Sequence, residues 1–263
     1  MIDLSGACGV PVSLGSDGIS LKFGPGVNMV EPDVRCLDDM REVLYNQTAA
    51  GPQELYYMYR GISRAEDAQA HARAGLRFDI TVLRGELVGT EYLKTAGHYH
   101  PAVPGGNLTY PELYQVLHGH AHYLLQKVGE SPGELADVVI IDAGPGDRVL
   151  VPPGYGHITI NPGPGPLVMA NWVASGFSSV YEPMRAHRGG AYYEVEEEGQ
   201  GLFVENDHYQ HVPEPRLVEP GVPEELGLPG GGPLYSCRLE CLAFLTDPHP
   251  YARVLAVALE EPR

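Results

Sequence analysis

The sequence predicts an all-β fold: a jelly-roll barrel, or double-stranded β-helix, with a few short helices and a C-terminal extension. Short β-branched and aromatic runs alternate with turns along most of the chain, which contains 33 Gly and 24 Pro. Only 19% of the residues are charged, so many turns and short strands are expected in place of long helices. The 263 residues are enough to bury a sizeable core.

The first third of the chain is predicted to form an edge arm, two short helices and the first barrel strands. Residues 10–30 alternate short apolar runs with Gly and Pro, as an arm or edge strand does. Residues 31–45 show helical spacing after a Pro-Asp start signal, and the alanine-rich residues 63–74 predict a second helix. Residues 76–93 read as two strands around the Arg84-Gly85-Glu86 turn.

The later strands and the tail differ in composition. Several β-branched or aromatic runs bounded by turns predict strands, at residues 112–117, 137–141, 149–151, 158–160 and 167–173. Residues 191–204 are expected to add a last strand or two. Residues 212–233 form a Pro- and Gly-rich linker, and residues 235–244 and 253–259 are predicted strands. We therefore expect a barrel with an N-terminal arm over residues 1–205, and a linker with a C-terminal extension over residues 206–263.

Charge and cysteine content exclude several classes of partner. Lys and Arg total 17 against 34 Asp and Glu, a formal net charge of −17, which argues against nucleic acid or an anionic membrane as the partner. The start has no basic segment and no apolar run approaches a membrane span, so we expect a cytoplasmic, soluble protein. The four cysteines are too sparse for a disulfide scaffold, and we interpret them as ordinary thiols.

Three histidines and a glutamate form the candidate site. His98 and His100 are two residues apart, so on an extended strand both rings leave the same face. Glu112 opens a strand-like run after a Pro/Gly/Asn-rich loop, and His157 follows the Pro152-Pro153-Gly154 turn. Three imidazoles and one carboxylate suit Fe, Mn, Zn or Ni and leave positions open for water or substrate.

A second histidine run, His118-Gly119-His120-Ala121-His122, also has the spacing of a metal site. Three histidines at period two could bind an ion on a strand. Gly119 is better explained as a hairpin turn before the strand that follows. We therefore interpret these three histidines as surface or turn residues.

The metal-ligand candidates occur within a longer composite motif. TAGHYH (95–100), ELYQVLHG (112–119) and PPGYGHITIN (152–161) fill every fixed position of TxGHxH, ExYxxLxG and PPxxxHxxxN. In this the sequence resembles the cupin-type glucose-6-phosphate isomerases of archaea and some bacteria, over roughly residues 20–185. One departure is SGFSSVY (175–181), where the family often has a His-x-Tyr pair and this chain keeps only the tyrosine.

The resemblance implies a cupin barrel that binds one divalent metal ion per subunit and acts on a phosphosugar in glycolysis and gluconeogenesis. The implied ligands are His98, His100, Glu112 and His157. The implied substrate contacts are Thr81, Thr95 and the Gly97 backbone for the phosphate, and Tyr114 with Tyr56 or Tyr59 for the sugar. A homodimer is implied as well, because cupins exchange edge strands.

Interconversion of glucose 6-phosphate and fructose 6-phosphate moves one hydrogen between C1 and C2. By an enediol route a base removes the C2 proton while positive charge stabilises the oxygens, and Glu112 is the candidate base as well as a candidate ligand. A metal-assisted hydride shift needs no base. The residues leave both routes open.

Two other functions remain open at this point. The first is another metal-dependent cupin enzyme, either an isomerase of a different sugar such as lyxose or mannose, or a dioxygenase. The second is a non-catalytic cupin that binds a sugar or serves as a store. Three observations distinguish these functions from the isomerase. Turnover of fructose 6-phosphate indicates the isomerase, oxygen uptake indicates a dioxygenase, and sugar binding without turnover indicates the non-catalytic protein.

Overall fold

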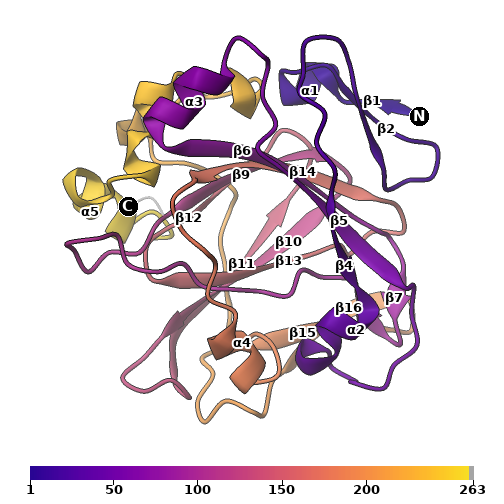
Figure 1. Cartoon of the computed structure of the whole chain (residues 1–263). Helices are drawn as coiled ribbons and strands as arrows, with labels where there is room; N and C mark the ends of the chain where they lie inside the picture. The colour runs from indigo at the N-terminus through magenta and orange to yellow at the C-terminus, as the bar shows by residue number, and fades with distance from the viewer. Residues whose placement is uncertain (261–263) are drawn as a thin grey trace.

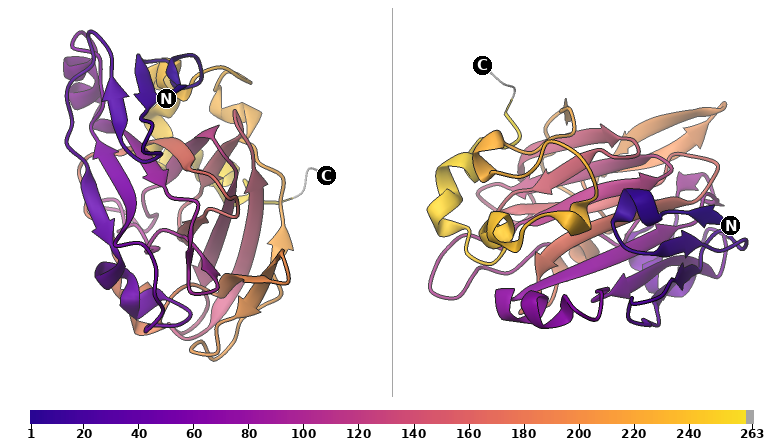
Figure 2. Two further views of the ribbon diagram at one scale, coloured as in Figure 1. Left: turned by 90° about the vertical axis from the view of Figure 1, so that its right-hand side faces the viewer. Right: turned by 90° about the horizontal axis from the view of Figure 1, so that it is seen from above.

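The computed structural model describes residues 1–260 and is built on two facing sheets, in which every strand pair is antiparallel except that of β11 and β17. Six strands form the larger sheet, in the order β12 (Arg148–Val151), β9 (Glu112–His118), β14 (Leu167–Ala174), β6 (Leu76–Leu83), β5 (Glu54–Arg60) and β4 (Asp33–Cys36). The facing sheet has the order β13 (Tyr155–Ile160), β10 (Ala121–Val128), β11 (Leu135–Ala143) and β17 (Arg216–Leu217). Figure 2 (left) shows the two sheets on opposite sides of the barrel. The predicted all-β barrel with a few short helices is confirmed.

Two small sheets and several short helices complete the molecule (Figure 1). One small sheet contains β16 (Gln200–Glu205), β15 (Tyr192–Glu197), β8 (Glu91–Tyr92) and β7 (Leu87–Val88), and the other contains β1 (Ile2–Asp3), β2 (Val12–Leu14) and β3 (Leu21–Phe23). The α-helices are α1 (Ser5–Cys8), α2 (Leu37–Met40), α3 (Ala68–Ala74), α4 (Glu182–Ala186) and α5 (Ala252–Ala256). The 3₁₀ turns are η1 (Arg41–Val43), η2 (Glu224–Leu226), η3 (Leu234–Ser236), η4 (Leu239–Leu245) and η5 (His249–Tyr251).

The predicted first helix is only partly right. Asp33–Cys36 pairs with β5 as an edge strand, and the helix begins at Leu37, where Asp39 accepts the Cys36 N–H (2.9 Å). Pairing with a neighbouring strand therefore outweighs helical spacing over the first turn. The second predicted helix is shorter than expected and ends at Gly75, whose φ of 67° is the left-handed conformation that glycine favours.

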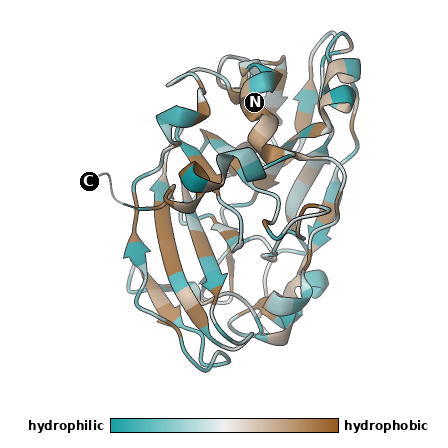
Figure 3. Ribbon diagram, turned by 90° about the vertical axis from the view of Figure 1, so that its left-hand side faces the viewer, coloured by the Kyte–Doolittle hydropathy of each residue, from teal (hydrophilic) through white to brown (hydrophobic). Residues whose placement is uncertain are grey.

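Side chains alternate between the two faces of the larger sheet, and both faces are covered. Hydrophobic and hydrophilic segments alternate along the strands in Figure 3. Towards the facing sheet, Val116 and Met169 pack with Tyr123 and Leu125 of β10. The outer face lies under the N-terminal arm and the C-terminal tail, which Figure 2 (right) shows in indigo and yellow. Burial on both faces explains why β14 is almost continuously apolar.

The tail is helical where strands were predicted. Residues 235–244 and 253–259 form mainly η3, η4 and α5. Residues 234–245 pack on the outer face of the larger sheet, so their backbone bonds locally, for example from Cys241 N to Arg238 O (3.0 Å). Trp172 of β14 fixes their position by donating from Nε1 to Leu234 O (3.0 Å). The division at residue 205 stays a prediction.

We expect Phe244→Ala to destabilise the protein strongly, because Phe244 is fully buried in the core that joins tail and barrel. The free energy of unfolding should fall by about 3–5 kcal/mol, as for other buried Phe truncations. Urea unfolding followed by tryptophan fluorescence measures it. Leu217→Ala is the control: Leu217 is 77% exposed, and its loss should change stability by less than ~0.5 kcal/mol. Equal midpoints for both variants would contradict the packing.

In residues 1–260 we find no helix with the length and apolar character that crossing a membrane requires. Cys8, Cys36, Cys237 and Cys241 are all free thiols, as predicted.

Candidate metal centre and substrate cavity

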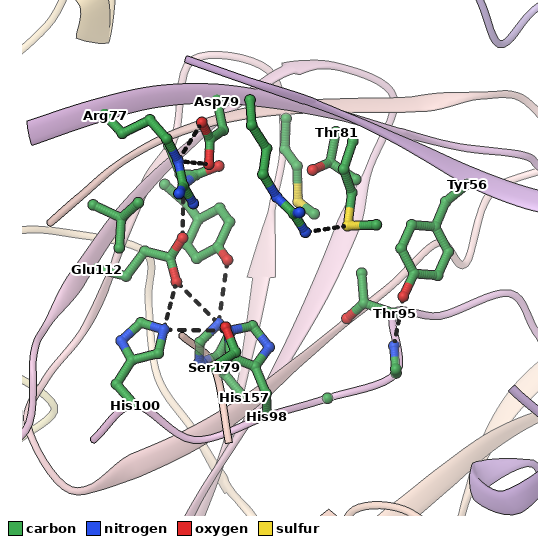
Figure 4. A pocket seen from close by; sticks show the side chains of 18 of the residues that line it. Tyr56, Arg77, Asp79, Thr81, Thr95, His98, His100, Glu112, His157 and Ser179 are labelled. Carbon is green, nitrogen blue, oxygen red and sulfur yellow. Dashed lines mark hydrogen bonds and ion pairs between the residues drawn. The ribbon is translucent and has the colours of Figure 1, made fainter. Parts of the chain in front are cut away.

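The two sheets bring His98, His100, Glu112 and His157 together. Residues 94–98 run antiparallel along β13, so that His98 and His157 form a bridge, with His157 N donating to His98 O (3.0 Å). Glu112 starts β9 in the opposite sheet. One ligand atom from each of the four residues lies within 4.8 Å of all the others, and Figure 4 shows the side chains converging.

The spacing of these atoms suits a single shared cation. His98 Nε2 and His100 Nε2 are 3.2 Å apart. Glu112 Oε2 lies 3.2 Å from His100 Nε2 and 3.2 Å from His157 Nε2. Ligand atoms that each bond one ion at 2.0–2.2 Å are about 3–3.5 Å apart, so the observed distances fit a common ion.

The hydrogen bonds around His100 also favour a cation. Its Nδ1 lies 2.8 Å from Tyr110 O, and because a carbonyl can only accept, Nδ1 carries the hydrogen. In the neutral ring Nε2 therefore presents a lone pair to Glu112 Oε2. That oxygen is buried without a hydrogen-bond partner among residues 1–260. Two facing acceptors repel each other unless positive charge lies between them, so the residues present fit a bound metal ion.

The protonation states of the histidines and of Glu112 also favour metal binding. Burial lowers the pKa of His98 well below its usual value, and the neighbouring His157 and His100 lower it further. Burial also lowers the pKa of His157. For Glu112 burial opposes ionisation, but the adjacent His100 and His157 outweigh it and hold the pKa well below normal. Neutral imidazoles and an ionised carboxylate are the forms that bind metals.

Groups behind the four residues fix their orientation. Asn171 on β14 donates from Nδ2 to Glu112 Oε1 (2.6 Å), which leaves Oε2 facing the imidazoles. The Tyr114 hydroxyl lies 3.2 Å from His157 Nε2, which is on the ligand side of that ring and not behind it. Phe177 packs against His100 with ring centroids 4.5 Å apart and stacks on Tyr110. Such outer contacts hold ligands in a binding geometry.

A cavity opens beside this cluster, and most of the predicted substrate residues line it: Tyr56, Thr81, Thr95, Gly97 and Tyr114. Figure 4 shows the imidazoles and Glu112 on one side, and Tyr56, Thr81 and Thr95 on the other. The Tyr56 hydroxyl accepts the Ala96 N–H (3.2 Å). A Cβ on Gly97 would lie 2.5 Å from the Ile158 side chain, at a φ of 72°, so glycine is required there.

Tyr59 must be withdrawn from the predicted set. Alternation along β5 turns Tyr56, Met58 and Arg60 to the cavity and Tyr59 to the opposite face. There its hydroxyl accepts the Leu21 N–H (2.9 Å), and the ring packs against Phe23.

Three charged residues that line the cavity were missed: Arg60, Arg77 and Asp79. The spacing could have identified them, because residues separated by an even number of positions on a strand share a face. Arg77 and Asp79 have this spacing to Thr81, and Arg60 has it to Tyr56. Arg77 Nε lies 2.9 Å from both oxygens of Asp79. Burial raises the pKa of Asp79 to about 6, although Arg77 opposes this.

The segment that departs from the family pattern also reaches the cavity, through Phe177, Ser179 and Tyr181. Tyr181 lies against His98, with ring centroids 5.5 Å apart. Lys94, next to Thr95, turns away from the cavity. It pairs with buried Glu91 and stands 4.6 Å over the Tyr193 ring.

Partial likenesses to solved structures include an oxalate oxidase and the oxalate decarboxylase of Bacillus subtilis. The oxidase has a TM-score of 0.36 and 13% identity, over 50% of this chain and 57% of that one. The decarboxylase has a TM-score of 0.33 and 16% identity, over 48% of this chain and 28% of that one. At these scores the likenesses do not bear on the function.

Proteins related in sequence match a larger share of this chain than these solved structures do. A protein of Thermococcus litoralis named glucose-6-phosphate isomerase is 28% identical over 200 residues, 73% of this chain and 96% of the relative. Proteins of the same name from Thermococcus kodakarensis and Pyrococcus furiosus are 29% and 27% identical, over 67% and 73% of this chain and 87% and 96% of the relatives. The family model described as glucose-6-phosphate isomerase matches residues 34–212, and the chain therefore belongs to the glucose-6-phosphate isomerase family.

Proposed function

We propose that this protein is a metal-dependent isomerase that interconverts glucose 6-phosphate and fructose 6-phosphate, in glycolysis and gluconeogenesis. The observation that carries the proposal is the convergence of His98, His100, Glu112 and His157 beside a polar cavity, in a chain of the glucose-6-phosphate isomerase family. The relatives named above support the choice of substrate.

The four converging residues would hold one divalent ion per subunit. A nitrogen-rich set with one carboxylate is compatible with Fe, Mn, Zn or Ni. When bound there, the ion would supply positive charge to the C1 and C2 oxygens of the sugar. His100 and Glu112 are already oriented for binding, because Tyr110 O and Asn171 hold their far sides.

The opposite side of the cavity would bind the phosphate. Thr81 and Thr95 offer hydroxyls, and Gly97 offers its backbone N–H, which has no side chain of its own to obstruct an anion. Arg60 is the cation on this side: its Nη1 is paired with Asp33, while its Nη2 lies 3.3 Å from Met58 Sδ, and Met58 pairs with Thr81 across β5 and β6. In a protein of net charge −17, a local cation offsets the unfavourable overall field.

Two carboxyl groups in the cavity could take the C2 proton. Glu112 is ionised, and its Oε2 faces the imidazoles; because the same oxygen would bind the ion, Glu112 would have to swing between the two roles to take the proton. Asp79 has the raised pKa, but Arg77 and the Gly61 N–H (2.8 Å) occupy its oxygens. We therefore propose Glu112 as the base.

A coupled assay of fructose 6-phosphate conversion with Mn²⁺ or Fe²⁺ tests the function. Formation of glucose 6-phosphate supports it. Oxygen uptake without isomerisation would point to a dioxygenase, the alternative cupin chemistry, and turnover of lyxose or mannose alone would point to another sugar isomerase. The homodimer and the cytoplasmic location stay predictions.

We expect Arg60→Ala to raise the KM for fructose 6-phosphate about tenfold, with a smaller effect on kcat, because a charge-assisted hydrogen bond to the phosphate is lost. Steady-state kinetics measure both constants. Arg73→Ala is the control, since Arg73 is bonded to Gln69 on α3 and should leave KM unchanged. If KM rises equally in both variants, or in neither, Arg60 does not bind the phosphate.

A further inference from the structure

A second group of potential ligands lies on the outer face of the smaller barrel sheet. His122 on β10 pairs with Asp142 on β11, and opposite residues of an antiparallel pair project to the same face. His120 precedes β10 in the turn that begins at Gly119, whose φ is 83°. The three residues offer ligand atoms within 4.8 Å of one another.

This group is separate from the cavity. Along β10, Tyr123 and Leu125 point into the core between the sheets, and Leu125 is the residue opposite His157. His122 has the opposite parity and faces outward with Leu124, beside the core that β15 covers. An ion bound at the outer group would therefore have the full thickness of the sheet between itself and the catalytic cavity.

The contacts converge on one carboxylate oxygen. His120 Nε2 is in direct contact with Asp142 Oδ1, and His122 Nε2 lies 3.7 Å from the same oxygen. The side chains are 47%, 20% and 65% exposed for His120, His122 and Asp142, so an ion can reach them from solvent. Two imidazole nitrogens and one carboxylate oxygen leave a position for water, as in open zinc sites.

Glu194 supplies an independent indication, because it fixes the ring of His122 from behind. Its side chain, on β15, is 2% exposed, and Oε2 lies 2.8 Å from His122 Nδ1. A carboxylate accepts the Nδ1 hydrogen, so the Nε2 lone pair of the neutral ring is directed at the group. The carboxylate–histidine pair is the arrangement that orients metal-binding imidazoles in many proteins.

We propose that His120, His122 and Asp142 form a second, surface site for a borderline divalent cation, for which Zn²⁺ is the probe. The ion would link the β9–β10 hairpin to β11 and, through Glu194, to β15. Because it binds the folded chain, it would stabilise that region by linkage. The strongly negative net charge favours a cation over an anion at this surface.

Zinc stoichiometry tests the proposal. Equilibrium dialysis followed by elemental analysis should find two Zn²⁺ per wild-type chain and one in the double variant His120→Gln/His122→Gln. His118→Gln is the matched control, from the same histidine run, and should keep both ions. Isomerase activity should be unchanged in both variants, which shows that they fold. Equal zinc content and affinity in wild type and double variant would overturn the proposal.

A second measurement tests the arrangement itself. Glu194→Gln should weaken zinc at the outer site about 10–100-fold, the usual loss when an orienting carboxylate is removed, and leave the other site unaffected. If burial of Glu194 prevents that variant from folding, Asp142→Asn at an exposed position serves instead and should lower the same affinity. An unchanged outer-site Kd in the variant that folds would contradict the assignment.

Discussion

Glu112→Gln lowers kcat for fructose 6-phosphate by about two to four orders of magnitude, the usual contribution of a positioned general base. The amide keeps the shape of the side chain and can still accept the hydrogen bond that Asn171 donates to Oε1. It cannot take a proton. Equilibrium binding of fructose 6-phosphate should weaken much less than kcat falls, and steady-state kinetics with a binding titration measure the two effects.

Asp79→Asn is the matched control, because Asp79 is the other carboxyl group that lines the cavity and the amide again preserves shape. Its effect on kcat should be at least tenfold smaller than that of Glu112→Gln. Isomerisation in D₂O adds a direct check on the route: a base-catalysed enediol route exchanges the transferred hydrogen with solvent. Retention of most activity in Glu112→Gln, or its loss only in Asp79→Asn, would show that Glu112 is not the base.

Removal of the metal with a chelator abolishes isomerase activity, and Mn²⁺ or Fe²⁺ restores it. The expected loss is about two to three orders of magnitude, as when positive stabilisation of a developing oxyanion is removed. Without the ion, the lone pair of His100 Nε2 and the Glu112 Oε2 atom face each other at 3.2 Å and repel each other. The melting temperature should therefore fall as well, and the same added ion should restore it.

His120→Gln/His122→Gln is the control for chelation, because it lacks only the proposed outer site. Its activity should show the same loss and the same recovery as the wild type. Full activity of exhaustively chelated enzyme, confirmed metal-free by elemental analysis, would contradict metal dependence.

The sequence predicted most of the site because its spacing is informative. His98 and His100 are two residues apart, and His157 follows a Pro-Pro turn. Both features can be recognised from the local sequence, because they depend little on contacts with distant residues. Glu112 was predicted as the oxygen ligand because it opens a strand-like run after a Pro/Gly/Asn-rich loop, and the family resemblance strengthened that prediction. The structure places all four together, while their role as ligands stays a prediction until an ion is measured.

Two kinds of feature could not be predicted from the sequence. Asp142 meets His122 only through the register of β10 and β11, and register depends on tertiary pairing. The tail has apolar residues suited to strands, but it crosses a sheet face and so forms helical turns. Tyr59 is a different case: strand alternation alone excludes Tyr56 and Tyr59 from sharing a face, so that correction was available from the sequence.

Anomalous diffraction from crystals grown with Mn²⁺ tests the central claim most directly. We predict one peak per chain bonded to His98 Nε2, His100 Nε2, Glu112 Oε2 and His157 Nε2 at about 2.0–2.3 Å. A map from metal-loaded, active enzyme with no peak among these four atoms would contradict the account.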